Sequence, residues 1–523
     1  MSIFTSVKVR KPKRTTFDLS HEVKLSTEFG RLTPFLCQEV IPGDTFKLSS
    51  NVFARMAPMI APIMSRVDLY THFFFVPNRL LWDHWEEFIT GGEDGTSLPI
   101  PPSIVASSLH EYNNVGSLAD YLGIPSNQDQ GMDPMSDNWN ISVLPFKAYQ
   151  KIYNDYYRDQ NLEDEIDIDI SQSAPYGKGI TKVPEQIFQL RTRAWQKDYF
   201  TAALPWAQRG PQVVLPVEGS ADLSFHNNDL TYERNHNGGN LASGTVTVGS
   251  DGHMYDGQGR AIVPDVDDFD IRVNTMSPTI NEVRRSFRIQ EWFENNARGG
   301  ARYIEQILSH FGVRSSDSRL QRAEYLGGGK SPILISEVLQ QSQTIEGGEN
   351  PSQLGQMAGH GVSAQTTHGF KHFFEEHGFV IGILSIMPKA SYMNGVPRMF
   401  RRDTKFDYAW PEFANLGEQE IKMTEIYSGT QQPNDTFGYV PRYSEYKYQP
   451  GSVHGDFRTT LKFWHLGRDF ANEPQLNSSF IKPNVSSLNR IFAVDNGSDH
   501  FWIQVYNNLQ AKRPLPYYGI PTI

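Results

Sequence analysis

Two stretches near the start of the chain decide its fold: FKLSSNVFARM (residues 46–56) and VDLYTHFFF (residues 67–75). In both stretches most of the apolar side chains recur at every second position. That period is typical of a β-strand with one buried face. The link between the two stretches contains Pro58 and Pro62, which exclude a regular helix or a central strand there. The sequence therefore predicts two long β-strands.

Strand-like patterns return near the end of the chain. Mainly apolar residues stand at every second position in 457–463 and in 501–505. Between these stretches, DNGSD (residues 495–499) predicts a hairpin-type turn. The apolar run FVIGILSIM (residues 379–387) is about half as long as a membrane helix requires and is predicted to be a buried strand. Early strands would have to pair with late ones, so we expect a mainly β fold, a Greek-key sandwich or jelly roll with large inter-strand insertions.

The middle of the chain has a helical period instead. Residues 147–161 and 281–311 place apolar side chains near a spacing of 3.6, and Gly299–Gly300 predicts a break in the second segment. The first segment carries four tyrosines, whose rings could stack on bases or sugars. At helical spacing we expect them to pack against protein instead. These tyrosines are Tyr149, Tyr153, Tyr156 and Tyr157.

Residues 217–278 are rich in Gly, Asn and Asp and carry ten acidic residues against three arginines. We expect this segment to be a surface excursion with a hairpin at residues 245–255. Its acidic run DVDDFD (Asp265 to Asp270) could attract Ca²⁺, but it lacks the Gly and the terminal Glu of an EF-hand loop. A solvated acidic turn is therefore the preferred interpretation.

Charge is unevenly distributed along the 523 residues. The net charge is −11, the wrong sign for a coat that contacts nucleic acid over its whole surface. The first 14 residues hold five cations and no acid, which leaves 43 basic against 59 acidic residues, or −16, in the remainder. A basic arm, placed at residues 1–32, suits phosphate contact; a solvated terminus is the alternative. The five cations are Lys8, Arg10, Lys11, Lys13 and Arg14.

Length alone suggests about three or four domains. One β-domain with insertions explains the pairing of distant strands better, so we expect a single domain over residues 33–523 with 217–278 as its surface insertion.

No catalytic motif is complete in this sequence. The single cysteine, Cys37, excludes an intramolecular disulfide and Cys-ligated metal centres, and it has no histidine close in sequence to activate it. GGGKS (residues 327–331) resembles the end of a phosphate-binding loop, but Glu324 stands where that motif needs its first glycine. We therefore predict a turn there, no cofactor, and no enzymatic activity.

A histidine-rich segment offers one more candidate. His360, His368, His372 and His377 lie near two glutamates, yet Gly369 stands where a zinc protease would have its general base. Ordinary polar histidines are the preferred interpretation. A weak metal site or a pH-responsive contact remains the alternative.

Long blocks of this sequence strongly resemble the major capsid protein of the Microviridae, in particular of the gokushoviruses. The blocks are VDLYTHFFFVPNRLLWDHWEEFITGG (residues 67–92), LPFKAYQKIYNDYYRDQNL (144–162) and DYFTAALPWAQRGPQVVLP (198–216), with FDLSHE (17–22) and KRPLPYYGIP (512–521) at the two ends. They occur in the same order and cover nearly the whole chain. Residues 217–278 match least, and they fall where gokushoviruses carry a variable insertion.

The resemblance implies an eight-stranded jelly roll of the viral capsid type that assembles into a small icosahedral (T=1) shell around circular single-stranded DNA. It implies that the insertion protrudes at the threefold axis and contacts a host receptor, and that the basic arm faces inward. It also implies a virion location, assembly in the bacterial cytoplasm, and scaffolding, pilot and small basic DNA-binding proteins as partners. The alternative from composition is a carbohydrate-active β-sandwich, a lectin or glycoside hydrolase, since aromatic residues and carboxylates are both abundant.

Overall fold

The computed structural model describes residues 13–518 except for 94–95, 98, 110–111, 127–139, 170–183, 212, 214–218, 226–231, 234–246, 249–253, 256–260, 265–268, 276–278, 301, 315, 340–356 and 494–496. The chain divides into two compact units. The larger comprises Met1–Ala207 with Ala297–Ile523, and the smaller comprises Gln208–Asn296. The two units are described separately.

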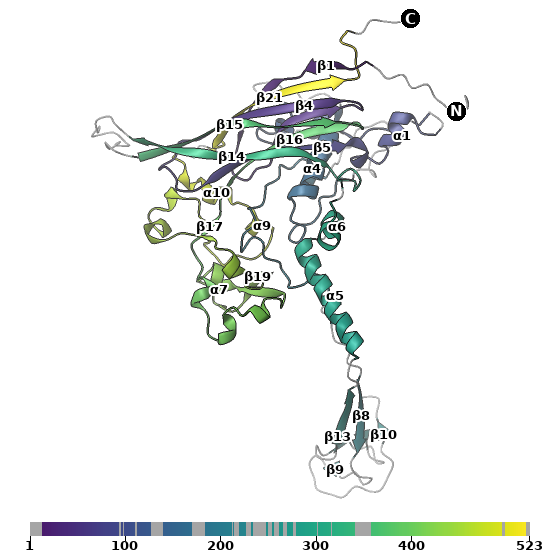
Figure 1. The fold of residues 1–523 in the computed structure, drawn as a ribbon, viewed down its shortest axis with the longest axis vertical. Coiled ribbons are helices and arrows are strands. Elements are labelled where there is room, and N and C mark those ends of the chain that lie inside the picture. Colours follow the sequence, from purple (N-terminus) through teal and green to yellow (C-terminus); the bar gives the residue numbers. More distant parts are fainter. Residues whose placement is uncertain are drawn as a thin grey trace. The chain divides into compact units, whose positions relative to one another are not determined.

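Nine strands of the described chain form one continuous antiparallel sheet in the larger unit (Figure 1). They are β1 (Thr15–Asp18), β2 (His21–Thr27), β3 (Thr33–Val40), β4 (Thr45–Met56), β5 (Val67–Pro77), β14 (Glu324–Leu339), β15 (Met357–Phe373), β16 (Gly378–Pro388) and β21 (Phe501–Arg513). The order is β1-β21-β4-β15-β14-β5-β16-β3, and β2 follows β1 along the same edge of β21. The nine strands therefore fill eight positions.

The sheet changes partners at β14. The first part of β14 pairs with β5 and its last six residues pair with β15. Numbered along the chain, the eight positions fall into two halves with the orders 1-8-3-6 and 5-4-7-2. That is the strand order of a jelly roll, as the sequence predicted.

The strands predicted at residues 46–56 and 67–75 are confirmed as β4 and β5, 379–387 as part of β16, and 501–505 as part of β21. The strand predicted at 457–463 is wrong. The chain there forms the 3₁₀ turns η9 (Gly455–Arg458) and η10 (Lys462–Trp464). Arg490 donates hydrogen bonds to the carbonyls of Lys462, His465 and Gly467, which a neighbouring strand would otherwise satisfy. Part of the turn predicted at 495–499 lies outside the described residues.

Two apolar cores flank the sheet. The inner core fills the space between the two halves with residues such as Leu48, Phe73 and Val505. A second core covers the other face of β5 and β16, where Phe74 and Ile381 pack against α4 (Leu144–Ile152) and the π-helical turn η3 (Tyr153–Tyr157). Because both faces of β5 are buried, four apolar residues can follow one another at 73–76 in its sequence.

The four tyrosines of the predicted helix belong to this second core, so the prediction that they pack is confirmed. Tyr149 donates to the carbonyl of Leu32 at 2.7 Å, and Tyr156 donates to that of Ala323 at 2.6 Å. Loops and short elements complete the cover over the second core. They are η1 (Asn78–Leu80), α1 (Trp85–Thr90), β6 (Ser103–Val105), α2 (Ala106–Leu109), α3 (Leu118–Tyr121), β7 (Asn140–Ser142) and η4 (Glu185–Ile187).

His72 is largely buried beside the second core, and its burial has a consequence for acid stability. Its Nδ1 lies 2.6 Å from the Tyr157 hydroxyl, and its ring contacts Phe74 and Tyr325 edge-on. Burial, together with the charge of Arg193, lowers the pKa of His72 to about 4. The imidazole is therefore neutral in the folded chain at pH 7.

We expect the free energy of unfolding to fall as pH decreases from 6.5 to 4. In the unfolded chain this imidazole has its ordinary pKa near 6.5, so it takes up a proton at a higher pH than in the folded chain. That difference lowers the free energy of unfolding by up to about 3 kcal/mol. His72→Asn should remove that part of the pH dependence in denaturant titrations, whereas the exposed control His454→Asn should keep it. Equal acid sensitivity of the wild type and His72→Asn would contradict this assignment.

The GGGKS segment is a strand, so the prediction of a turn is wrong. Residues 327–331 lie within β14, where the register with β5 shifts between Tyr325 and Gly327. A side chain at Gly328 would meet the carbonyl oxygen of Thr71, and one at Gly329 would meet the ring of His368. The glycines thus allow close packing of strands and are not a phosphate cradle.

A third core joins residues 199–203 to the part of the larger unit that follows β16. It gathers Phe200, Tyr392, Ile421 and Phe437. The elements of this region are β17 (Ser391–Tyr392), η6 (Arg398–Phe400), η7 (Lys405–Asp407), η8 (Pro411–Phe413), β18 (Glu418–Lys422), α7 (Met423–Ile426), β19 (Thr436–Pro441), α8 (Ser444–Lys447), β20 (Gly451–Ser452), α9 (Ser478–Ile481), α10 (Val485–Leu488) and η11 (Asn489–Ile491).

The smaller unit contains the predicted insertion. β8 (Gly219–Phe225) pairs antiparallel with β13 (Phe269–Thr275), and β10 (Thr247–Val248) pairs with β11 (Met254–Tyr255) as the hairpin prediction requires. β11 also pairs with β12 (Ala261–Pro264), and β12 pairs with β9 (Tyr232–Glu233). Of the acidic run Asp265 to Asp270, only its last two residues lie within the described part, in β13.

The helical prediction for residues 281–311 is also confirmed. α5 (Ile280–Gly299) and α6 (Tyr303–Phe311) are separated at the predicted glycine pair, and Gly300 has φ of +98°, which favours glycine. Among the described residues, no helix has both the length and the apolar character that a membrane span requires.

Candidate nucleic-acid interface

The predicted phosphate-contacting residues lie at the start of the sheet. Lys8, Arg10 and Lys11 fall outside the described residues. Lys13 and Arg14 are exposed and directly precede β1. The Arg14 guanidinium lies 5.1 Å from the centre of the Phe373 ring at the end of β15, a cation–π contact that ties Arg14 to the sheet.

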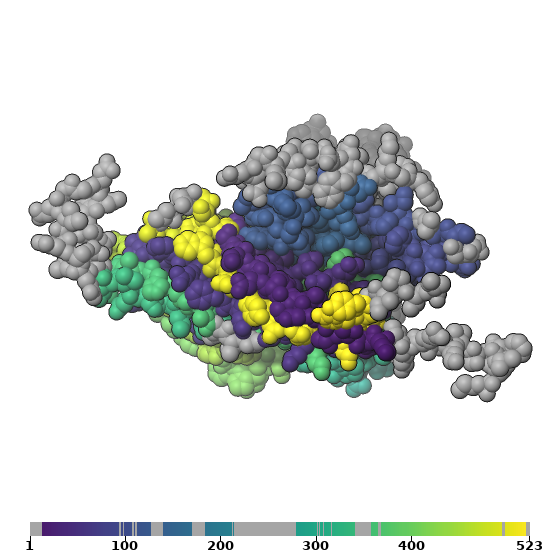
Figure 2. Space-filling view, turned by 90° about the horizontal axis from the view of Figure 1, so that it is seen from above, coloured from purple at the N-terminus to yellow at the C-terminus, as the bar shows by residue number. Residues whose placement is uncertain are grey.

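The beginning and the end of the chain are held together at this point. β1 runs along β21 with Thr15 opposite Arg513 and Thr16 opposite Lys512. Phe17 stacks on Tyr517 with ring centres 6.0 Å apart. Figure 2 shows the N-terminal strands in purple beside the C-terminal strand in yellow.

A buried carboxylate anchors the same corner. Arg513 Nε lies 3.3 Å from Asp44 Oδ2, and the Asp44 side chain is fully buried. Burial raises the pKa of Asp44, while a backbone hydrogen bond from Ile41 and the charges of Arg513 and Arg14 act in the opposite direction. The corner is therefore organised by charge as well as by strand pairing.

Three exposed lysines lie beside the point where the arm enters. Lys47 of β4 stands opposite Lys371 of β15, and Lys512 of β21 is the diagonal neighbour of Lys47. All three point away from the inner core, because the alternate positions Phe46, Leu48 and Ala511 are buried. We call Lys47, Lys371 and Lys512 the lysine cluster.

Among the described residues, none of the three forms an ion pair. Like charges directly opposite on neighbouring strands are destabilising, so an anion bound here would relieve a repulsion that the fold retains. Sequence reasoning missed the cluster because its members are hundreds of residues apart. Of the three lysines, only Lys47 has a predictable position, because it lies on the polar side of the alternating stretch at residues 46–56.

The histidines of the predicted cluster do not converge. His368 Nδ1 lies 2.8 Å from Thr71 Oγ1, His372 Nε2 lies 3.7 Å from Glu324 Oε2, and the His377 ring packs on Trp85. His360 pairs with Ser336 across β14 and β15. Burial lowers the pKa of His368 and His372. The described residues contain no group of three potential metal ligands.

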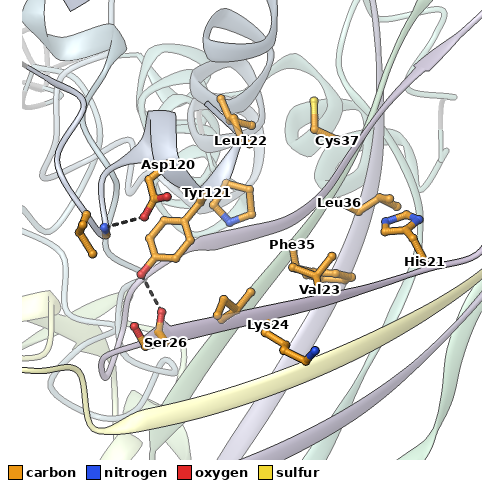
Figure 3. Close-up of a pocket in the computed structure, with 15 residues that line it drawn as sticks. His21, Val23, Lys24, Ser26, Phe35, Leu36, Cys37, Asp120, Tyr121 and Leu122 are labelled. Carbon is orange, nitrogen blue, oxygen red and sulfur yellow. Dashed lines mark hydrogen bonds between the residues drawn. The ribbon is translucent and has the colours of Figure 1, made fainter. Parts of the chain in front are cut away.

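Cys37 lines a cavity of about 400 Å³ between β2 and β3, which also contains His21 and Tyr121 (Figure 3). Burial raises the pKa of the Cys37 thiol to about 12, so it is protonated at neutral pH. His21 Nδ1 lies 2.9 Å from the Leu19 carbonyl and Nε2 lies 3.3 Å from the Asn507 amide. Both nitrogens of the His21 ring therefore have partners, and His21 does not activate the Cys37 thiol.

Comparison with known proteins decides the family. Residues 5–523 match the model of the capsid protein (F protein) family. The chain belongs to this family. The jelly-roll strand order agrees with that membership, and this capsid protein is a component of a Microviridae phage particle, as the resemblance predicted.

Individual relatives carry the same designation. The capsid protein VP1 of Chlamydia phage 1 is 34% identical to this capsid protein over 99% of the chain and 97% of the relative. VP1 of Bdellovibrio phage phiMH2K is 35% identical, and VP1 of Spiroplasma virus 4 is 28% identical, each over 97% of the chain and 95% of the relative. These relatives are structural proteins, so the prediction that the chain is not an enzyme is confirmed.

Proposed function

We propose that this capsid protein is the major subunit of a small icosahedral (T=1) shell that encloses circular single-stranded DNA. The family match over residues 5–523 carries the proposal, and the jelly-roll strand order supports it. Membership in a capsid family implies repeated copies in one shell. It also favours the shell subunit over the carbohydrate-active β-sandwich considered from composition.

Contact with DNA phosphates is assigned to Lys8, Arg10, Lys11, Lys13 and Arg14. The exposure of Lys13 and Arg14 and their position next to the lysine cluster support this assignment. Each phosphate contact adds a term that is independent of base sequence and sensitive to salt. A separate small basic protein supplies further neutralisation, and scaffolding and pilot proteins assist assembly in the bacterial cytoplasm.

Host attachment is assigned to the insertion at residues 217–278. It lies within the separate compact unit Gln208–Asn296, which supports a role apart from the jelly roll. The receptor would be a molecule on the host surface.

Electron microscopy tests the shell proposal directly. The full-length chain, produced with the other proteins of its phage, should form particles of uniform size that contain DNA protected from nuclease. A chain that remains monomeric in every ionic condition, with no particles in producing cells, would exclude the proposed shell.

A further inference from the structure

The half-sheet that holds the lysine cluster also presents aromatic rings on its outer face. Buried and exposed side chains alternate along β21 in this half-sheet. Phe501, Ile503 and Val505 are buried, whereas Trp502 is 48% exposed and Tyr506 is 40% exposed. Exposed rings that share one face of a sheet with cations supply the two kinds of contact that unpaired nucleic acid uses, stacking and charge.

The rings are placed by strand register. Trp502 stands opposite Arg55 of β4, and Gln504 stands opposite Phe53, whose ring lies 5.3 Å from the Arg55 guanidinium. Trp502 Nε1 donates to the carbonyl of Asp499 at 3.1 Å, which orients the indole. We call Trp502, Tyr506, Phe53 and Arg55 the aromatic platform.

Polar side chains connect the aromatic platform to the lysine cluster. Asn508 and Gln510 follow Tyr506 along β21, and Gln510 stands opposite Lys47. From Trp502 to Lys512 the strand covers about 34 Å, at roughly 3.4 Å per residue. The same face thus offers rings at one end, amides in the middle and lysines at the other.

The described acids of this face lie along β1 and β2. They are Asp18 and Glu22, and Gln504 donates to Glu22 at 3.2 Å. The cations are more numerous: Lys24, Lys47, Arg55, Lys371 and Lys512, with Lys13 and Arg14 at the corner. Although the chain as a whole is acidic, this face is basic.

We infer that the aromatic platform and the lysine cluster together bind unpaired DNA, with bases stacked on Trp502 and Tyr506 and phosphates on the lysines. The inference rests on the proposed function and extends it from an arm that contacts phosphates to a folded surface that holds bases. Stacking on exposed rings needs bases that are free of a duplex, which matches single-stranded DNA. A twofold contact between two copies centred on the lysine cluster would instead bring like charges together.

Binding of labelled oligonucleotides to the full-length chain tests this assignment. The probes are oligo(dT) and an abasic strand with the same number of phosphates, and the readout is fluorescence anisotropy. The wild type should bind oligo(dT) at least about 5-fold more tightly than the abasic strand. Trp502→Leu with Tyr506→Leu should remove that preference, whereas the exposed control Trp410→Leu should keep it.

The lysines are tested by the salt dependence of the same binding. Lys47→Gln with Lys371→Gln should weaken both probes and reduce the slope of log K against log salt by about 1.4, at roughly 0.7 per contact. The control pair Lys389→Gln and Lys447→Gln should leave the slope unchanged. Unchanged thermal unfolding establishes that each variant is folded.

Two outcomes would overturn the inference. One is the same base preference in the platform variant and in Trp410→Leu. The other is unchanged oligonucleotide binding with loss of particle assembly, which would make the face a contact between copies. If the wild type still forms particles that contain DNA, either outcome leaves the proposed shell function unchanged. If the wild type forms no particles, the shell function itself is contradicted.

Discussion

Particles in which residues 220–274 are replaced by Asn-Gly should assemble normally and fail to attach to host cells. Gly219 and Thr275 are opposite partners at the base of the β8–β13 pair, so their Cα atoms are about 5 Å apart and a two-residue hairpin turn can join them. The replacement therefore removes most of the insertion without pulling the jelly roll apart. We expect adsorption to fall by orders of magnitude while the yield of DNA-containing particles stays close to wild type.

Adsorption is measured by counting free particles after incubation with host cells, and assembly by sedimentation and electron microscopy. In the matched control, Asn-Gly replaces only residues 249–253, between β10 and β11. This control measures the effect of shortening a loop within the same unit. Loss of assembly in the larger replacement would make the insertion a shell contact. Normal adsorption by intact particles would exclude it from attachment.

Neutralising the basic arm should have the second large effect. With Lys8, Arg10, Lys11, Lys13 and Arg14 all changed to Gln, five phosphate contacts are lost, which removes about 3.5 from the slope of log K against log salt. Between 50 and 200 mM salt, the wild-type affinity for single-stranded DNA should then fall about 100-fold more than that of the variant. Encapsidated DNA per particle, measured by absorbance ratio and nuclease protection, should fall in parallel.

A smaller matched pair controls for net charge. Lys13→Gln with Arg14→Gln should lower the slope by about 1.4, while Arg284→Gln with Arg285→Gln, two exposed changes in α5, should leave it unchanged. Genome content that is unaffected by the five-fold neutralisation would remove the arm from DNA contact. Equal effects of the two pairs would show that only total charge matters.

The two patterns that failed show the limit of local information. The alternation at residues 457–463 is overridden because the Arg490 side chain, and not a strand, satisfies the backbone acceptors. The GGGKS segment is rich in turn residues, yet it is a strand because its backbone pairs with β5, and its glycines leave room for Thr71 and His368. Propensity describes a segment alone, whereas its partners are chosen in three dimensions.

The sequence by itself determined the alternating strands of the jelly roll, the helical segments with their glycine break, and the family. Each of these follows from a period or a long block of neighbouring residues. Only the tertiary structure decided which side chains share a surface. Lys47, Lys371 and Lys512 meet because β21 inserts between the first strands and β4, and Trp502 joins them on one face because side chains alternate along a strand. Register over hundreds of residues is set by packing of the whole sheet, so no local pattern contains it.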